Sequence, residues 1–377
     1  MRLYADHNAT APLRPEARAA MQEALDWVGN PSSAHREGVR ARRALEAARA
    51  QVAGLIGATP TEIVFTSGAT EANALALHGA PLGDAPLITS PIEHASVVEP
   101  AQERIRLGGD VRWLQVDQQG RIEAADVTAL CQGRACFTTL GLANGEVGAI
   151  APIAAVAKLA HAHGGLLHTD AAQAAGRVPI DVRELGVDLL SLSGHKLGGP
   201  AGVGALYVRR DLSLTAMLGG GSQERGRRAG TENLIGIVGF GAAAAAAHQA
   251  LPEATVALCR RRDRLWAGLR ASLPDLVRNG PDTDSLPNTL NVTVPGVSGA
   301  SLLVLLDLAG VAASLGSACS AGSHEASHVL LAMGRDDGQA RSGLRLSLGH
   351  DTSDDDVARL IEIIPAVVSR ARAGVAA

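Results

Sequence analysis

The stretches "GGLLHTDAAQAAG" (residues 164–176) and "VDLLSLSGHKLGGP" (187–200) decide the fold. Each contains a short run of almost entirely apolar residues, which is typical of a strand that is covered on both faces of a sheet. Each run ends at polar residues, with Asp170 after the first and Lys196 after the second. Ligands of such sheets bind beyond the carboxyl ends of the strands, so these two residues are candidates for a functional site.

Similar apolar runs recur from about residue 60 to residue 210. The seven expected strands cover residues 62–66, 85–89, 111–115, 134–140, 164–169, 187–192 and 203–208. Helix-length segments such as 152–163 lie between most of them. The sequence therefore predicts a seven-stranded α/β sheet with helices on both faces.

The rest of the chain predicts two further long helices and a second domain. The helices are expected at 36–56, which has apolar residues on one face, and at about 232–273. The tail then changes character, with apolar segments at 288–294, 301–310 and 344–348 and a last helix from about 354. We expect a large α/β domain at 16–255 and a small α+β domain formed by 1–15 and 256–377.

Composition narrows the class of protein. Of the 377 residues 46% are hydrophobic, which suits a globular fold. A formal charge of −4 and an aromatic content of 2% disfavour nucleic-acid binding. The longest uncharged apolar run, 234–247, is too short to span a bilayer, and the first residues do not resemble a signal peptide. The four cysteines form no CxxC pair, so we expect a cytoplasmic protein without membrane contact.

A candidate phosphate site lies in "VFTSGATEANAL", where a strand stops at Ser67-Gly68 and a helix begins at Ala69-Thr70. The unpaired N–H groups and the dipole of a helix N-terminus attract phosphate, and Gly68 allows close approach. Thr70 could instead be a simple helix cap. The chain has no Walker lysine and no GxGxxG here, so a nucleotide site is not supported.

The other groups of the same ligand could be bound by Asp170, Gln173 and Lys196. Asp170 could be only a helix cap and Lys196 only a surface residue, but a carboxylate and an amine at buried strand ends need partners. Lys196 is one of only two lysines, and the other, Lys158, lies in an amphipathic helix and is expected in solvent. A phosphate for Thr70, a ring nitrogen for Asp170 and an aldehyde for Lys196 together describe pyridoxal 5'-phosphate.

Ten short motifs carry a resemblance to a known family. They are, in chain order, "YADHNATAPL", "GNPSSAHREG", "FTSGATEAN", "IEHASV", "ANGEVG", "HTDAAQA", "SLSGHK", "AGTEN", "GSACSAGS" and "LRLSLG". With these motifs the chain resembles, nearly from end to end, the cysteine desulfurases of the nitrogen-fixation and iron–sulfur-cluster group. These are pyridoxal-phosphate enzymes of the class V aminotransferase superfamily.

The resemblance implies the fold and the role of each site residue. The fold would be that of the type I pyridoxal-phosphate transferases, with a mostly parallel sheet. Lys196 would bind the cofactor aldehyde, Asp170 the ring nitrogen and Gln173 the ring hydroxyl, while His94 would stack on the ring. The phosphate would be held by Ala69, Thr70, Ser193 and His195, together with Thr231 from the other subunit of a homodimer. Asn144 and Arg345 would hold the substrate, Arg345 through its carboxylate.

Cys319, in "SLGSACSAGS" (314–323) of the expected small domain, would take the sulfur of L-cysteine as a persulfide and leave L-alanine. Lys196 would remove the α-proton and His94 would assist proton transfer. The small residues around Cys319 predict a mobile loop, and the sulfur would pass to an acceptor or iron–sulfur scaffold protein. Cys319 could instead be an unreactive thiol. The other cysteines, Cys131, Cys136 and Cys259, are expected to be structural.

Some features depart from the family, and some alternatives stay open. Gly145 stands where the family usually has a second Asn, and the chain ends soon after its last helix, which leaves docking to a scaffold open. A selenocysteine lyase, another class V enzyme or a catalytically silent dimeric scaffold are alternatives. A metal site of His161, His163, His168 and Asp170 is disfavoured, because His161 and His163 lie on different faces of a helix. We expect no metal.

Overall fold

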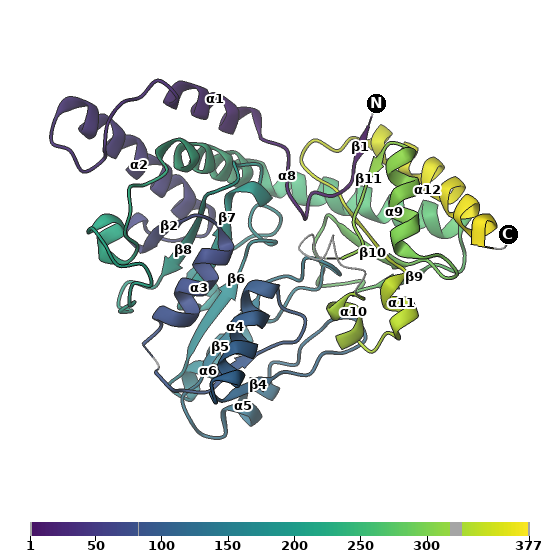
Figure 1. Cartoon of the computed structure of the whole chain (residues 1–377), viewed down its shortest axis with the longest axis horizontal. Coiled ribbons are helices and arrows are strands. Elements are labelled where there is room, and N and C mark those ends of the chain that lie inside the picture. The colour runs from purple at the N-terminus through teal and green to yellow at the C-terminus, as the bar shows by residue number, and fades with distance from the viewer. Residues whose placement is uncertain (1, 82, 317–325, 376–377) are drawn as a thin grey trace.

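The computed structural model describes residues 2–81, 83–316 and 326–375, so Cys319 lies outside the described residues. A seven-stranded sheet forms the centre of the larger part of the molecule (Figure 1). Its strands are β2 (Ile63–Thr66), β3 (Leu87–Thr89), β4 (Val111–Trp113), β5 (Phe137–Gly141), β6 (Leu166–Asp170), β7 (Leu189–Ser193) and β8 (Gly204–Val208). Their order is β2-β8-β7-β6-β5-β3-β4. Only β8 runs against its neighbours, so the expected mostly parallel seven-stranded sheet is confirmed.

Alternation along the strands explains why helices cover both faces. In β7, Leu190 and Leu192 belong to one hydrophobic core, while Leu189 belongs to the core on the other face. Helices α2 (Arg36–Leu55), α6 (Ile153–Ala162) and α8 (Leu234–Ser272) pack on the first face. Helices α3 (Ala69–Gly79) and α4 (Ala95–Arg106) pack on the second. With both faces covered, the strands read in the sequence as nearly continuous apolar runs.

A smaller part has a hydrophobic core of its own (Figure 1). Its antiparallel sheet has β10 (Thr289–Thr293) between β9 (Val277–Asn279) and β12 (Gly343–Ser347). The first strand of the chain, β1 (Leu3–Tyr4), pairs in parallel with β11 (Val311–Ala312) beside them. Helices α9 (Gly299–Leu308) and α12 (Asp354–Val375) complete this part.

Helix α8 contributes to both large cores. Phe240 and Ala244, near its start, pack against the seven-stranded sheet, whereas Leu265 and Leu269, near its end, lie in the core of the smaller part. The expected domain boundary at residues 255–256 falls inside this helix, so the two-domain division stays a prediction. By length and composition α8 could cross a membrane, but half of its most apolar window is buried inside the protein, as in a core helix.

Short elements complete the described chain. They are α1 (Pro15–Ala24), α5 (Asp126–Cys131), α7 (Val182–Leu185), α10 (His328–Ala332), α11 (Asp337–Arg341) and the 3-10 turns Pro60–Glu62, Gly194–Lys196 and Gln223–Gly226. Helices α10 and α11 form a small core with Ile92 and Val147, which come from loops at the carboxyl ends of the sheet strands. This small core packs α10 and α11 against the strand ends that form the site described below.

Candidate active site

A cavity of about 390 Å³ lies where β5, β6 and β7 end and where α3 begins. Ten of the residues expected in the site line this cavity: Ala69, Thr70, His94, Asn144, Asp170, Gln173, Ser193, His195, Lys196 and Arg345. Thr231 does not line it and borders a separate cavity of about 90 Å³ together with Ser67 and Gly202. The strand ends therefore bring together residues that lie up to 276 positions apart in the chain.

Lys196 lies in the 3-10 turn that follows β7 and is half-buried. Its Nζ donates a hydrogen bond to the backbone oxygen of Asn8 at 2.6 Å. Gln173 donates to the same oxygen through Nε2 at 3.0 Å. The N-terminal segment thus brings the amine of Lys196 and the amide of Gln173 together on one acceptor.

Asp170 ends β6 and accepts two hydrogen bonds, from the backbone N–H of Ala172 at 2.9 Å and from Nδ2 of Asn73 at 2.7 Å. Asn73, which is buried in α3, also donates to Oγ of Ser96 at 2.8 Å. Ser96 Oγ in turn contacts Nδ1 of His94 at 2.8 Å. A continuous chain of polar contacts therefore connects the carboxylate to the imidazole and holds both groups in place.

His94 caps α4 and faces the cavity. Its Nδ1 accepts the backbone N–H of Ser96 at 3.1 Å, so the neutral ring carries its proton on Nε2. Removal from water lowers the pKa of His94, an effect that the charge of Asp170 opposes and the charge of Lys196 reinforces. At neutral pH the ring is therefore uncharged and can stack on an aromatic ligand or accept a proton.

Glu93, next to His94 in the chain, is a buried carboxyl group at the cavity wall. Its Oε2 accepts the backbone N–H of Gly141 at 2.7 Å. Burial first, and then the charge of Asp170, raises the pKa of Glu93 to about 8. Glu93 is therefore protonated at neutral pH.

The N-terminus of α3, where the sequence predicts a phosphate site, lies at the cavity. Gly68 precedes the helix, and β8 packs so closely behind it that a Cβ atom on Gly204 would lie 2.6 Å from the Gly68 backbone. The ring of His195 contacts Oγ1 of Thr10 at 3.1 Å. Burial, with the charges of Lys196 and Arg177, lowers the pKa of His195 to about 4, so this ring is a neutral hydrogen-bonding group.

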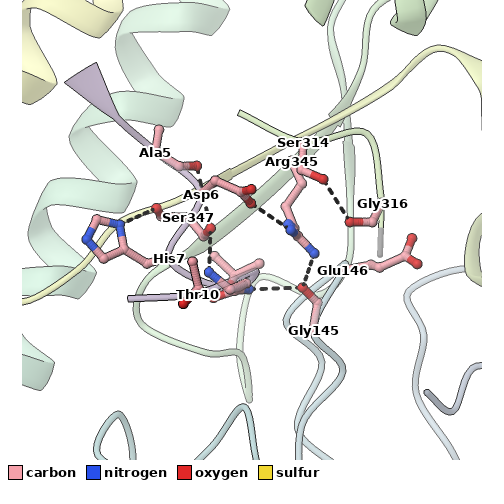
Figure 2. A network of polar contacts seen from close by, with 12 residues as sticks. Ala5, Asp6, His7, Thr10, Gly145, Glu146, Ser314, Gly316, Arg345 and Ser347 are labelled. Carbon is pink, nitrogen blue, oxygen red and sulfur yellow. Dashed lines mark hydrogen bonds and ion pairs between the residues drawn. The ribbon is translucent and has the colours of Figure 1, made fainter. Parts of the chain in front are cut away.

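Arg345, in the middle of β12, is 2% exposed and faces the cavity from the smaller part. Figure 2 shows its two contacts, from Nη2 to Oδ1 of Asp6 at 2.7 Å and from Nη1 to the backbone oxygen of Gly145 at 3.2 Å. Its Nε is buried without a hydrogen-bond partner. A guanidinium has five N–H donors, so this one keeps donors for an anionic ligand.

Asn144 lines the cavity, but its side-chain hydrogen bonds go to the backbone. Its Nδ2 donates to the oxygen of Ile92, and its Oδ1 accepts the N–H groups of Glu146 and Val147. These contacts shape the loop after β5. Direct contact of Asn144 with a ligand stays a prediction.

Several residues of the site were not identified from the sequence: Asp6, Asn8, Asn73, Glu93, Ser96 and Arg177. Glu93 stands beside His94 in "IEHASV", and an acidic residue in that position was the one available signal. The others have partners that lie between 2 and 339 residues away, and no local pattern marks them.

The remaining cysteines and histidines have other surroundings. Cys131 and Cys136 are buried, and burial, with the neighbouring Cys136, raises the pKa of Cys131 to about 12. His161 pairs with Asp188 at 2.8 Å, whereas His168 is buried between hydroxyl groups of the sheet. Within residues 2–81, 83–316 and 326–375, no cluster of three or more His, Cys, Asp or Glu side chains could hold a metal ion.

Known proteins are similar to this chain over nearly its whole length. The class V aminotransferase family model matches residues 3–360. A cysteine desulfurase of Cereibacter sphaeroides is 43% identical over 378 residues, covering 99% of this chain and 97% of the relative. A cysteine desulfurase of Trichormus azollae is 40% identical over 375 residues, covering 98% and 94%.

Solved structures are similar over nearly the whole chain. A NifS-like protein has a TM-score of 0.91 at 33% identity, covering 98% of this chain and 100% of that chain. A structure described as SspA in complex with cysteine has a TM-score of 0.81 at 35% identity, covering 92% and 98%.

Proposed function

Because this chain belongs to the class V aminotransferase family, we propose that it is a cysteine desulfurase that uses pyridoxal 5'-phosphate. It converts L-cysteine to L-alanine and supplies the sulfur for iron–sulfur cluster assembly. The observation that carries the proposal is that Lys196, Asp170 and His94, which come from three different strand ends, line one cavity. The family relation and the geometry thus point to the same reaction.

The residues of the cavity fit the cofactor. Its volume of about 390 Å³ lies within the usual range of small-molecule sites. The start of α3 offers N–H groups for the phosphate, Asp170 offers a carboxylate for the ring nitrogen, and Lys196 offers the amine for the aldehyde. Bound there, pyridoxal phosphate supplies an electron sink that stabilises negative charge at the substrate α-carbon.

The protein's own residues then hold the substrate and move its protons. Arg345 binds the substrate carboxylate with the donors that Asp6 and Gly145 leave open. Lys196, whose amine lines the cavity and would hold the cofactor aldehyde, would take the α-proton. Neutral His94, which lines the cavity, would stack on the ring of the cofactor and would assist proton transfer through its uncharged imidazole.

Cys319 is the proposed sulfur acceptor within the enzyme. The Cys319 thiol releases its proton, the resulting thiolate forms a bond to the substrate sulfur as the bond from that sulfur to the substrate Cβ breaks, and Cβ takes up the released proton. The products are a persulfide on Cys319 and L-alanine, and no oxidant is needed. The neighbouring described residues support this role, since Ser314 pairs with the backbone of Arg345 and Ser327 donates to Glu146 at 2.6 Å. Arg345 and Glu146 both line the cavity.

The assembly and setting complete the proposal. Two chains form a cytoplasmic homodimer in which Thr231 reaches the phosphate site of the other subunit. Its position outside the cavity of its own chain supports that arrangement. The persulfide sulfur then passes to an acceptor or iron–sulfur scaffold protein.

The test is a product assay on the purified protein with L-cysteine and a thiol reductant. We expect a yellow protein that forms alanine and sulfide in equal amounts. Lys196→Ala should form neither product, and borohydride should no longer attach the cofactor to the chain. Cys319→Ser should keep the yellow colour and lose sulfide release, whereas the control Cys259→Ser should behave like the wild type. A colourless protein without alanine formation would refute the proposal, and turnover of selenocysteine alone would favour a selenocysteine lyase.

A further inference from the structure

Arg177 is a buried cation whose hydrogen bonds all go to neutral oxygens. It is 6% exposed. Its Nη1 donates to the backbone oxygen of Gln173 at 2.7 Å and to Oε1 of the same residue at 2.5 Å. Its Nη2 donates to the backbone oxygens of His7 at 3.1 Å and Lys196 at 3.3 Å. One guanidinium therefore joins three segments that surround the cofactor site.

No carboxylate of the described residues forms an ion pair with Arg177. A buried charge without a partner of opposite sign is costly, and here only neutral oxygens compensate it. Burial, and then the charge of Arg345, lowers the pKa of Arg177 to about 9, which still leaves it protonated at neutral pH. His195 also faces this charge. The surplus positive charge suits an anion bound in the cavity.

The contacts of Arg177 also determine the orientation of Gln173. A guanidinium can only donate hydrogen bonds, so the atom of the Gln173 amide that it contacts is the oxygen. The amide nitrogen is then turned to the other side, toward the Asn8 oxygen that also accepts from Lys196. Gly145 leaves room for this arrangement, since a Cβ atom there would lie 2.7 Å from Nε2 of Gln173.

We propose that Arg177 is a positioning residue: it holds the Gln173 amide with its NH2 group toward Lys196 and the cofactor ring hydroxyl, and its charge favours the ionised hydroxyl. This inference rests on the proposed function, because it assigns a partner to the Gln173 amide in the cofactor site. Arg177 acts through Gln173 and does not line the cavity itself. An NH2 group facing the ring oxygen can only donate, so it stabilises the anionic form of that oxygen.

The experiment is a pH titration of the visible absorption of the bound cofactor in the purified holoenzyme. Loss of a nearby positive charge makes deprotonation harder, so Arg177→Met should move the midpoint up by about one pH unit or more. Arg177→Lys keeps the charge and should shift it less than half as far. Gly145→Ala keeps Arg177 but displaces the Gln173 amide, and it should also move the midpoint upward. Arg183→Met, at an exposed arginine paired with Glu62, is the control and should leave the midpoint unchanged.

Each possible result either supports or overturns the inference about Arg177. An Arg177→Met protein of lower thermal stability with an unchanged midpoint would show a purely structural role and overturn the inference. If Arg177→Met does not fold, Gly145→Ala decides, since an upward shift supports the inference and an unchanged midpoint overturns it. A wild-type protein without a visible band would overturn the proposed function and this inference with it, whereas a normal band with unmoved variants would overturn only the inference.

Discussion

Glu93 and Asp170 show how surroundings change the chemistry of two similar carboxyl groups. Asp170 is held by two hydrogen-bond donors, Asn73 and the N–H of Ala172. Glu93 has the N–H of Gly141 and is otherwise enclosed, so its pKa rises to about 8. Glu93 is therefore uncharged at neutral pH, and Asp170, which its two donors hold in place, is the carboxyl group available to the proposed ring nitrogen.

The raised pKa of Glu93 predicts a pH-dependent stability. The carboxyl ionises near 4.5 in the unfolded chain and near 8 in the folded one, so its contribution to folding is complete below pH 4.5 and is lost as the pH rises through 8. Glu93→Gln keeps an acceptor for Gly141 and removes the titration. We expect this variant to lose less stability between pH 5 and 8 than the wild type, by at least about 1 kcal/mol, in urea unfolding.

The matched control for Glu93 is Glu99→Gln, at an exposed position of α4. Its stability should follow the wild-type pH profile. Identical profiles for Glu93→Gln and the wild type would show that the buried carboxyl does not titrate in this range.

Replacing Arg345 should weaken substrate binding and leave cofactor binding intact. Lysine carries the charge but lacks the planar fork that holds a carboxylate through two hydrogen bonds, so Arg345→Lys should raise the KM for L-cysteine by about tenfold or more. The bound cofactor should keep its colour. Arg341→Lys makes the same change at an exposed ion pair with Asp337 and should leave the KM unchanged. An unaltered KM in Arg345→Lys would exclude this contact with the substrate.

At the scale of elements, the start of α3 depends on its contact with β8. Gly204 begins β8, and a Cβ atom there would lie 2.5 Å from the oxygen of Leu192 and 2.6 Å from the backbone of Gly68. Both neighbours are backbone atoms, so they cannot move aside without disturbing the sheet or the first turn of the helix. The proposed phosphate-binding site at the start of α3 therefore depends on the absence of a side chain at Gly204 in β8.

Gly204→Ala should therefore cost about 1–3 kcal/mol of folding stability and weaken cofactor binding. Differential scanning calorimetry and a cofactor titration measure the two effects. Gly54→Ala is the matched control, because Gly54 lies in α2 with open space around its Cβ position. This control should be neutral or slightly stabilising, since alanine favours helix. Equal melting temperatures for the two variants would contradict the close contact.

At the scale of the whole molecule, the active-site cavity combines residues from both parts of the chain. The larger part supplies the strand ends and α3, while the smaller part supplies Arg345 through β12. The N-terminal segment lies between them: Asp6 pairs with Arg345, and the Asn8 oxygen accepts from Lys196. Motion between the two parts would thus change substrate contacts and cofactor contacts together.

The proposed homodimer predicts complementation between two defective chains. If Thr231 serves the other subunit, a heterodimer of Thr231→Ala and Lys196→Ala chains contains one intact site, and its activity should be about half that of the wild type. Purification with two different tags isolates this heterodimer, and alanine formation measures its activity. The two mutant homodimers are the controls. A heterodimer with only half the activity of the Thr231→Ala homodimer would place Thr231 in its own chain's site.

Some helices and strands could be predicted from the sequence, and others could not. The seven strands were predicted at their observed places because all but the edge strand β4 are buried on both faces, and burial on both faces leaves an apolar run. Helix α1 was not predicted, since its exposed residues weaken the apolar pattern, and the two-residue strands β1 and β11 are too short to leave one. Ten expected site residues line the cavity. Thr70, Asp170, Gln173 and Lys196 were visible locally as polar residues at strand ends or a helix start, whereas the roles of the other six came from the family resemblance.

Neighbours along the chain were enough to predict the strands of the large sheet, the long helices and the polar residues that follow these strands, because such patterns are local. Only the tertiary structure decided the order of the strands, the reversed direction of β8, the protonation of Glu93 and the contacts of Arg177 with Gln173, His7 and Lys196. The physical reason is that hydrogen bonding, desolvation and Coulomb interactions depend on distances in space, and these groups meet only after distant segments have packed together.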